Sequence, residues 1–236
     1  MKFIMRSAPA AKDSEASSAA AIVQRLEEEI ALGLLRPRER LVEDDLLNRF
    51  GTKRHVIRQA LFDLEAMGIV VRPPNRGAVV RDLSSAEIEQ IYFVRELLER
   101  AAMEVMPLPA APALIATLTE LHERHSKAAR DGRLREVFRL NLEFHKQLFD
   151  ACGNAQLSDA IQQFAFKSHA VRSCTIGEPK LLAKVCDEHA RMIKLMRGDE
   201  RNRDALIKLA SEHKRPAKQA YLQTLRRIEP GDDTAG

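Results

Sequence analysis

Apolar side chains recur every three or four positions in three consecutive stretches of the first third of the chain, which predicts amphipathic helices. These stretches cover 19–34, 43–50 and 54–67. Gly51 lies between the second and third stretches, and Gly68 follows the third, where glycine commonly ends a helix. Two short β-prone runs follow, 69–71 and 78–80, separated by a turn that contains Pro73, Pro74, Asn75 and Gly77. Helix, tight turn, helix and hairpin together predict a winged helix-turn-helix.

Helical periodicity dominates the remainder of the chain. Ser84 and Glu87 form a capping-box pattern at the start of a long helix, which prolines after Met106 bring to an end. Further helical stretches follow at about 113–130, 134–151, 156–174, 180–197 and 200–225. Pro216 is expected to kink the last of them. The sequence therefore predicts a mainly α protein, in which a winged helix-turn-helix precedes an all-helical bundle of about six or seven helices.

This pattern divides the chain into four segments. Residues 1–17 are rich in alanine and serine and lack periodicity, so we expect them to be disordered. The winged domain is expected over 18–82 and the all-helical domain over 83–228, with a disordered tail at 229–236. Glutamates occupy positions 27–29 of the first helix, and we expect them to face solvent because glutamate is rarely buried.

Charge and cysteine content narrow the class of protein. The chain of 236 residues has a formal net charge of +4 and a sequence pI near 9.0, which is compatible with a polyanionic partner. Its basic side chains concentrate in residues 36–81. Cys152, Cys174 and Cys186 form no pairing pattern and are expected to be reduced thiols. No apolar run approaches the roughly 20 residues that span a bilayer, and the N-terminus has too short an apolar core for a signal peptide, so we expect a cytoplasmic protein without a membrane partner.

The start of the second helix of a helix-turn-helix is the part that meets the major groove of DNA. In this chain it carries Lys53, Arg54, His55 and Arg58. Arginine is the usual partner of guanine, so we expect Arg54 and Arg58 to read bases, and Lys53 and His55 to contact phosphates. An ion pair of Arg58 with Asp63 or Glu65 is the alternative. At the wing tip, Arg76 is expected to reach the minor groove or its phosphates, within the DNA-binding run Asn75, Arg76 and Gly77.

The same segment resembles the DNA-binding domain of GntR-family transcription regulators. The positions that match the family pattern are Leu35, Pro37, Leu41, Glu43, Leu46, Phe50, Gly51, Arg54, Ile57, Arg58, Ala60, Leu61, Leu64, Gly68, Ile69, Val70, Asn75, Arg76, Gly77, Ala78 and Val80. The chain departs from the pattern where Arg38 replaces glycine and Thr52-Lys53 replaces Val-Ser. Asp44 stands where some members carry a DNA-contacting arginine. The resemblance implies a transcription regulator, and the departures bear on which operator it reads.

Four side chains of the helical region form a candidate metal site. Asn141 and His145 are one helical turn apart on one face, and His189 and His213 lie on the last two helices. Imidazole is the commonest metal ligand, and helix-borne ligands can converge in the core of a bundle. Without a carboxylate in the set, the charge of a divalent cation would attract an anionic ligand. The alternative is that these histidines are hydrogen-bonded or surface residues, since His122, His125 and His169 show that histidines also occur elsewhere in the chain without a pattern.

The helical region resembles the FCD domain of FadR-type GntR regulators. The matching runs are Val94-Arg95, Leu98-Glu99 and Ala102, then Asn141, Phe144-His145 and Gly153-Asn154, and last Glu188-His189, Gly198-Asp199, Ala205 and His213. In metal-binding members, the positions of Asn141, His145, His189 and His213 hold the ligands. Asn141 stands where aspartate is commoner. The resemblance implies a divalent metal, with zinc the first choice and nickel or manganese the alternatives.

Two further side chains of the helical region each have two possible roles. Arg95 is a candidate for binding the carboxylate of an effector, because a guanidinium offers a bidentate fork. Its alternative is an ion pair with Glu96 or Glu99. Cys186 lies one turn before His189 and is either a further ligand or a small buried hydrophobic residue.

Three functions are compatible with these features. The first, which we favour, is a repressor of transcription whose helical domain binds a small organic acid at a metal. The second is an all-helical metalloenzyme with Glu143 or Glu188 as the acid or base, although the chain has no HExxH motif. The third is a metal-independent regulator that binds an acyl thioester, as some FadR-type members do. One winged domain reads few base pairs, so we expect a homodimer, formed mainly through the helical domain, on a palindromic operator.

Overall fold

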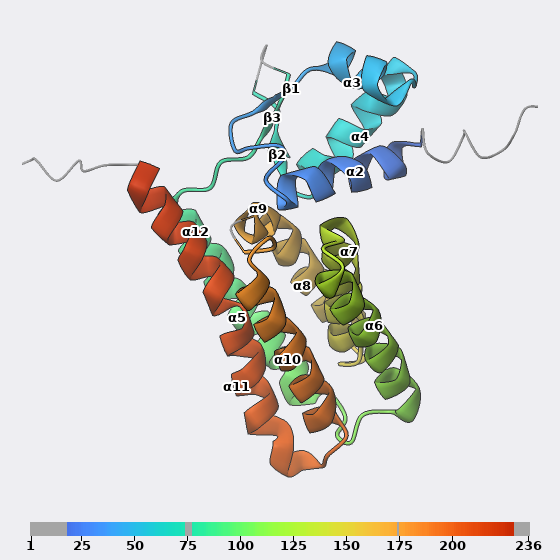
Figure 1. Ribbon diagram of the computed structural model, residues 1–236, viewed down its shortest axis with the longest axis vertical. Helices are drawn as coiled ribbons and strands as arrows, with labels where there is room; N and C mark the ends of the chain where they lie inside the picture. The colour runs from blue at the N-terminus through green and yellow to red at the C-terminus, as the bar shows by residue number, and fades with distance from the viewer. Residues whose placement is uncertain (1–17, 74–76, 174, 229–236) are drawn as a thin grey trace, which may run out of the picture.

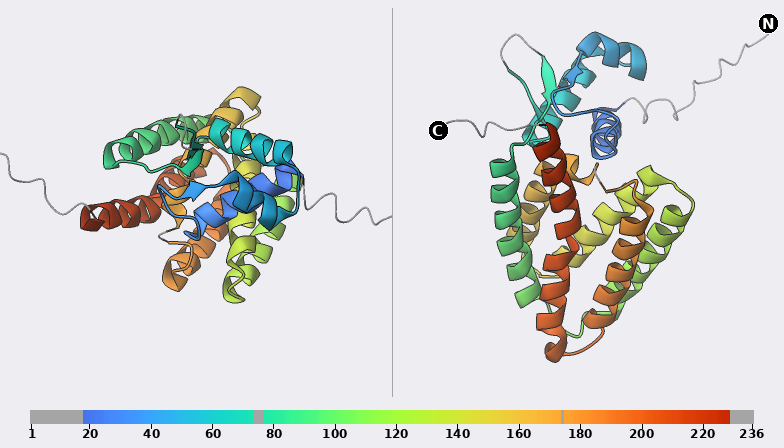
Figure 2. Two further views of the ribbon diagram at one scale, coloured as in Figure 1. Left: turned by 90° about the horizontal axis from the view of Figure 1, so that it is seen from above. Right: turned by 60° about the vertical axis from the view of Figure 1, so that its left-hand side comes forward.

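The structure is a computed structural model that describes residues 18–73, 77–173 and 175–228. The disorder expected at 1–17 and 229–236 falls outside these residues. Figure 1 shows a smaller winged part at one end of a bundle of long helices, and both views in Figure 2 agree with this arrangement. Among the described residues, no helix is both long enough and apolar enough to cross a membrane.

The winged part combines three helices with a small antiparallel sheet. Its helices are α2 (Ala19–Ala31), α3 (Glu43–Phe50) and α4 (Arg54–Ala66). The strands are β1 (Arg40–Leu41), β2 (Val70–Val71) and β3 (Ala78–Val80), in the order β1-β3-β2. Val79 in the central strand pairs with Arg40 on one side and with Val71 on the other. The predicted hairpin is confirmed, whereas β1 was not predicted because two residues are too few to show an alternating pattern.

Local sequence sets the ends of these helices. The Ser18 hydroxyl caps α2 by accepting a hydrogen bond of 3.2 Å from the Ala21 N–H. Gly51 has a left-handed φ of 57°, which ends α3 and makes the tight turn into α4. The helix α2 ends at Ala31 rather than at the predicted residue 34, because the chain turns through Gly33 with φ 72°. The buried faces of the three helices then meet in one core, which includes Ile22, Leu26, Ile57, Leu61 and Leu64.

The bundle contains eight α-helices among the described residues. They are α5 (Ser85–Val105), α6 (Pro112–Arg130), α7 (Leu134–Asp150), α8 (Ala155–Lys167), α9 (His169–Arg172), α10 (Pro179–Met196), α11 (Arg203–His213) and α12 (Arg215–Ile228), with a 3-10 turn at Glu200–Asn202. The predicted capping box is present, since Ser84 accepts from the Glu87 N–H and Glu87 accepts from the Ser84 N–H. The core of the bundle includes Met103, Phe138, Phe144, Met192 and Leu206.

Two stretches predicted as single helices are broken in the structure. The first break separates α8 from α9 at Ser168, whose hydroxyl donates a hydrogen bond of 2.9 Å to the Ala165 carbonyl. Such side-chain bonds compete with the helical pattern. The second break separates α11 from α12 at Lys214, just before Pro216. Proline lacks an N–H, and its ring collides with the carbonyl four residues earlier, so the predicted kink becomes a break.

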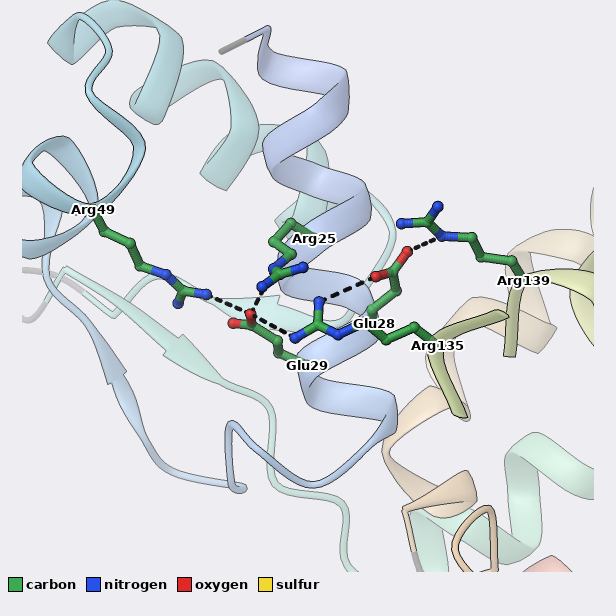
Figure 3. Close-up of polar contacts among 6 residues, drawn as sticks. All are labelled: Arg25, Glu28, Glu29, Arg49, Arg135 and Arg139. Atoms are coloured by element: carbon green, nitrogen blue, oxygen red, sulfur yellow. Dashed lines mark hydrogen bonds and ion pairs between the residues drawn. The ribbon is translucent and has the colours of Figure 1, made fainter. Parts of the chain in front are cut away.

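The winged part meets the bundle through the glutamates of α2, which is the opposite of the predicted solvent exposure. Glu27, Glu28 and Glu29 are all buried, and the Glu28 side chain is 0% exposed. Figure 3 shows Glu28 paired with Arg139 and Arg135 of α7, and Glu29 paired with Arg25, Arg49 and Arg135. The partners from α7 lie more than 100 residues further along the chain, so the periodicity of α2 does not reveal them.

Candidate nucleic-acid interface and candidate metal centre

The start of α4 presents the predicted DNA-binding side chains to solvent. Lys53 occupies the N-cap position, and the exposed side chains are those of Lys53, Arg54, His55 and Arg58. The first turn of α4 has no acidic residue, so the partial positive charge of the helix end adds to that of the side chains. The N–H groups at a helix start also bind phosphate oxygens. This surface therefore has the exposure and charge that a nucleic-acid contact requires.

Acidic residues of α3 bind both arginines of this surface. Arg54 Nη2 lies 2.7 Å from Asp44 Oδ1, and its Nη1 lies 3.3 Å from Glu43 Oε2. Arg58 Nε lies 3.1 Å from the same Glu43 oxygen. The alternative partners expected for Arg58 were wrong, because the turn at Gly51 brings α3 closer to it. Exposed ion pairs contribute about 0–1 kcal/mol, so DNA can displace them at small cost.

Only part of the wing lies within the described residues. Gly77 precedes β3 with a left-handed φ of 69°, which allows the turn back from the wing tip. Asn75 and Arg76 fall outside the described residues, so their contact with DNA stays a prediction.

Three of the four candidate metal ligands converge in the bundle. His145 of α7, His189 of α10 and His213 of α11 each place a ring nitrogen within 4.8 Å of the others. Nε2 of His145 lies 3.2 Å from Nε2 of His213. Asn141, one turn before His145, is buried and lines the same cavity as His145 and His213. The break before Pro216 therefore leaves His213 directed at the other two histidines.

The nitrogens have the geometry and protonation that a metal ligand needs. Two nitrogens 3.2 Å apart, each at about 2.1 Å from one ion, subtend an angle of about 100° there, between octahedral and tetrahedral values. Burial, followed by the charge of His213, holds the pKa of both His145 and His189 well below 6.5, so both rings are neutral. The ring nitrogens of His189 and Nδ2 of Asn141 have no hydrogen-bond partner among the described residues. These residues therefore fit a divalent cation.

Glu188 orients one of the three rings. Its Oε2 lies 2.7 Å from Nδ1 of His213, which leaves Nε2 of that ring free to face the centre. Burial raises the pKa of Glu188, but the hydrogen bond with His213 and the charge of that ring outweigh it, so the pKa falls below 4.5. A carboxylate behind a ligating histidine is a common outer partner of metal sites. The position of Glu188 favours this orienting role over the acid or base role considered from the sequence.

His125 and Cys186 lie beside the three histidines without joining them. The Cys186 sulfur lies 3.5 Å from Nδ1 of His125, whose ring centre is 5.2 Å from that of His189. Burial, with smaller effects of His122 and His213, lowers the pKa of His125 to about 4. Among the described His, Cys, Asp and Glu residues, the set of mutually close metal-binding atoms contains His145, His189 and His213. Cys186 therefore packs against a neutral histidine in place of ligating.

Arg95 forms the ion pair that was the alternative to effector binding, and it also lines the cavity. It is buried, its Nη2 lies 2.9 Å from Glu99 Oε1, and its Nη1 donates a hydrogen bond of 2.9 Å to the Ser168 hydroxyl. The same residue lines the cavity with His145 and His213. The ion-pair partner is Glu99, whereas Glu96 accepts a hydrogen bond from Ser211. Much of the positive charge of Arg95 is therefore already balanced.

Arg172 is the cavity residue that sequence analysis missed. It ends the four-residue helix α9 and lines the cavity with Arg95 and the histidines. Its side chain forms no ion pair or hydrogen bond within the part of the chain that the structure describes. Burial, and then the charge of Arg95, lowers its pKa to about 10, which still leaves it protonated at neutral pH. A guanidinium that has no ion pair with any described residue makes this cavity attractive to an anion.

The two parts of the chain match two known protein-family models. The family model for bacterial regulatory proteins of the gntR family matches residues 18–80, and the model for the FCD domain matches residues 90–215. The HTH-type transcriptional regulator YdhC of Bacillus subtilis is 27% identical over 182 residues, covering 77% of this chain and 80% of that protein. The transcriptional repressor RspR of Escherichia coli is 24% identical over 197 residues, covering 81% and 83% respectively.

A solved structure has the same fold. A transcriptional regulator GntR from Rhodococcus sp. RHA1 superimposes with a TM-score of 0.70 at 18% identity, covering 87% of this chain and 97% of that one. The relatives named here are transcription regulators, which does not support the metalloenzyme considered from the sequence.

Proposed function

The chain belongs to the GntR family of bacterial regulatory proteins and carries an FCD domain, and from this membership we propose that it is a repressor controlled by a small carboxylate at a divalent metal. Residues 18–82 bind DNA, and residues 83–228 bind the effector and hold two copies together. The name of the relative RspR, a transcriptional repressor, supports the direction of control. The observation that carries the proposal is one cavity lined by His145 and His213, which with His189 could hold a metal ion, and by Arg172, which has no ion pair with any described residue.

The DNA-binding role of the winged part rests on the start of α4. Arg54 and Arg58 exchange the carboxylates of α3 for base edges, and Lys53 and His55 contact phosphates. Asn75, Arg76 and Gly77 of the wing contact the neighbouring minor groove. Each good bidentate contact of arginine with guanine discriminates against other bases by about 1–3 kcal/mol. A two-fold dimer places two such helices on a palindromic operator.

The metal is held by Asn141, His145, His189 and His213, and zinc suits the nitrogen-rich set best. Nickel and manganese are the alternatives. When bound, the cation supplies positive charge and open coordination positions for an effector carboxylate. Arg172 and Arg95 supply hydrogen bonds to the same carboxylate from the cavity wall. Neutral protein ligands leave the cation's charge uncompensated, so an anion is the favoured occupant.

Dimer formation is supported by an exposed apolar strip on α5. Phe93 and Leu97 are one turn apart, and their exposures are 66% and 54%. Large apolar side chains so exposed in a soluble regulator commonly lie in interfaces. This strip is on the outer face of the helix, away from the cavity residues Arg95 and Glu99. The helical part therefore offers a surface on which a second copy can pack.

Metal analysis of the purified full chain tests the proposal. The parent is expected to retain about one divalent ion per chain after dialysis, and the His145→Ala/His189→Ala variant is expected to lose it. His125→Gln is the matched control, because His125 is a buried neighbour outside the group of three histidines, and it should keep the ion. Equal metal content in the parent and the double variant would contradict the proposed site.

A further inference from the structure

A second cavity shares part of its wall with the cavity that His145 and His213 line. It has a volume of about 460 Å³, against about 100 Å³ for the first. Both cavities are lined by the same six residues, Arg95, Glu99, Phe138, His145, Phe149 and Arg172. From this junction the second cavity extends between α7 and α8 to α2, where Gln24, Glu27 and Glu28 form part of its wall.

We propose that the two cavities hold one elongated monocarboxylic acid. Its carboxylate lies at the junction, its middle is apolar, and a hydrogen-bond donor at its far end reaches Glu27 and His169. The inference rests on the proposed function, since it names the chemical class of the effector of the same site. It adds that the effector touches the DNA-binding part directly, through α2.

The volumes favour a ligand longer than a two-carbon or three-carbon acid. Pockets for organic ligands typically enclose about 300–1,000 Å³. The first cavity, at about 100 Å³, falls below that range, and a metal ion with its remaining ligands takes up much of it. The second cavity lies within the range. An acid that fills both must therefore continue past Arg172 toward α8.

Charge fixes the position of the carboxylate. Arg95 is paired with Glu99, and Arg139 at the far wall is paired with Glu28. Arg172 lines both cavities and has no ion pair with any described residue, so it is the wall guanidinium with free hydrogen-bonding capacity at the junction. A carboxylate at this point is within the cavity of His145 as well. The head of the ligand therefore belongs at the junction of the two cavities.

Apolar side chains form one part of the wall of the second cavity, namely Phe138 and Phe149 of α7 and Ile161, Ala165 and Phe166 of α8. Charged side chains, including those of Arg139, Glu143 and Lys146 of α7, form another part. Aromatic side chains prefer edge-to-face or offset contacts with other rings. A ligand with an aromatic or branched hydrocarbon middle gains buried area against the apolar side chains.

The far end of the cavity holds a buried pair of His169 and Glu27. His169 is 0% exposed and stands edge-on to Phe138 and Phe166, with ring centres 5.3 and 5.4 Å away. Its Nδ1 lies 2.9 Å from Oε1 of Glu27, whereas its Nε2 has no hydrogen-bond partner among the described residues. Buried acceptors left in this state cost free energy. A hydroxyl group on the ligand would supply the missing donor.

The helix α9 links this ligand to the rest of the molecule. Arg172 faces the cavities, and Val171 packs in the cluster that joins α5, α9 and α12. Ala170 packs in the core of the winged part, and His169 meets Glu27. A ligand that holds Arg172 and His169 at once therefore contacts both ends of α9, which packs against α2.

Binding of a graded set of acids to the zinc-loaded full chain tests the inference. The probes are acetate, phenylacetate and 4-hydroxyphenylacetate, measured by isothermal titration calorimetry. Affinity is expected to rise at least tenfold from acetate to phenylacetate, because the ring enters the second cavity. It is expected to rise again with the hydroxyl group, which meets His169 and Glu27.

Filling the second cavity provides the matched variants. Ala165→Phe is expected to abolish the gain of phenylacetate over acetate while acetate still binds, which also shows that the variant is folded. Gln162→Trp fills the same cavity from the preceding turn of α8, and it replaces Ala165→Phe in the experiment if that variant does not fold. Ala183→Phe makes the same substitution at an exposed position of α10 that lines a different cavity, and it should keep the gain.

The two possible failures are distinguishable. If acetate binds but the two aryl acids bind no tighter, or bind equally well to Ala165→Phe, the inference is overturned and the proposed function stands. If no probe binds the zinc-loaded chain, the carboxylate effector itself is wrong, and the inference falls with it.

Discussion

Asp44 changes the chemistry of the DNA-binding surface more than any other departure from the family pattern. It stands where some family members carry a DNA-contacting arginine, and here it binds Arg54 at 2.7 Å. An acidic side chain beside the recognition helix opposes the phosphates of DNA at any sequence. It also competes with guanine for Arg54. We therefore expect Asp44 to lower the affinity for DNA in general and to fix the direction of the Arg54 side chain.

Asp44→Asn is expected to tighten binding to both operator and unrelated DNA, because it removes a negative charge from the contact surface. The gain is expected to be severalfold at low salt and to shrink as salt rises, since exposed charges are screened. Fluorescence anisotropy with the two duplexes measures it. Asp204→Asn, on α11 in the helical part, is the charge-matched control. A variant with unchanged affinity for both duplexes would show that Asp44 does not face DNA.

Buried neutral histidines make the metal-free protein sensitive to acid. The pKa of His125 falls to about 4 in the folded chain because of burial, while it stays near 6.5 in the unfolded chain. The unfolded state therefore binds more protons between these two values, and stability is lost as the pH falls below about 6.5. From pH 7 to pH 5, His125 alone is expected to cost about 2 kcal/mol of unfolding free energy.

Urea unfolding of the chelator-treated chain at pH 7 and pH 5 checks this expectation. His125→Leu removes the titrating ring, so its loss of stability over the same pH change should be about 2 kcal/mol smaller. His55→Leu, at an exposed position, should behave like the parent. An identical pH dependence for His125→Leu and the parent would contradict the account.

At the scale of elements, the chain's own pattern predicts most helices and fails where partners are distant. The helix-turn-helix, the wing strands and the capping box of α5 follow from local spacing and from glycine or serine at the right positions. The burial of Glu28 depends on Arg135 and Arg139, which only the folded chain brings near. A run of three glutamates carries no local signal of that burial.

The residues of the candidate site could likewise be predicted only in part from the sequence. Asn141, His145, His189 and His213 could be proposed because their spacing fits a known family pattern. Arg172 could not, because what distinguishes it is its place in the cavity wall without an ion pair to any residue that the structure describes. Its short helix α9 is also separated from α8 by a break that periodicity does not show. Local patterns predict ligands, whereas an uncompensated charge is visible only in the folded protein.

A double-mutant cycle on Glu28 and Arg139 measures the contact between the two parts of the chain. Glu28 is fully buried, so Glu28→Gln and Arg139→Gln are expected to show a coupling of more than about 1 kcal/mol in unfolding free energy. The exposed pair Arg100 and Glu104, 2.8 Å apart on α5, is the control and should show about 0.5 kcal/mol or less. Equal coupling in both cycles would show that the interdomain pair is only a surface contact.

At the scale of the whole molecule, the winged part and the bundle share a contact that includes the wall of the second cavity. Glu27 and Glu28 of α2 line that cavity, and α2 also packs in the core that supports α4. A ligand can shift the two parts only if it binds their arrangements with different affinity, typically by about 1–3 kcal/mol. A ligand in the second cavity touches α2, so its affinity can depend on how the winged part sits against the bundle.

Two copies of the chain are expected to pack through α5. Phe93→Glu with Leu97→Glu places two charges in the exposed apolar strip and is expected to yield monomers at micromolar concentration. Metal content should be unchanged, because both side chains point away from the cavity. Sedimentation velocity measures the state, with Phe62→Glu, another exposed aromatic position, as the control. A monomeric parent, or a double variant that remains dimeric, would contradict this placement of the interface.

We expect a carboxylate to act on DNA binding through a metal held by the histidines of the bundle. The affinity of the full chain for its operator is measured with and without 4-hydroxyphenylacetate, before and after treatment with a chelator. The acid is expected to change the affinity by about five- to 150-fold, an effect that disappears in the metal-free protein and returns when zinc is restored. A metal-free protein that still responds fully to the acid would contradict it.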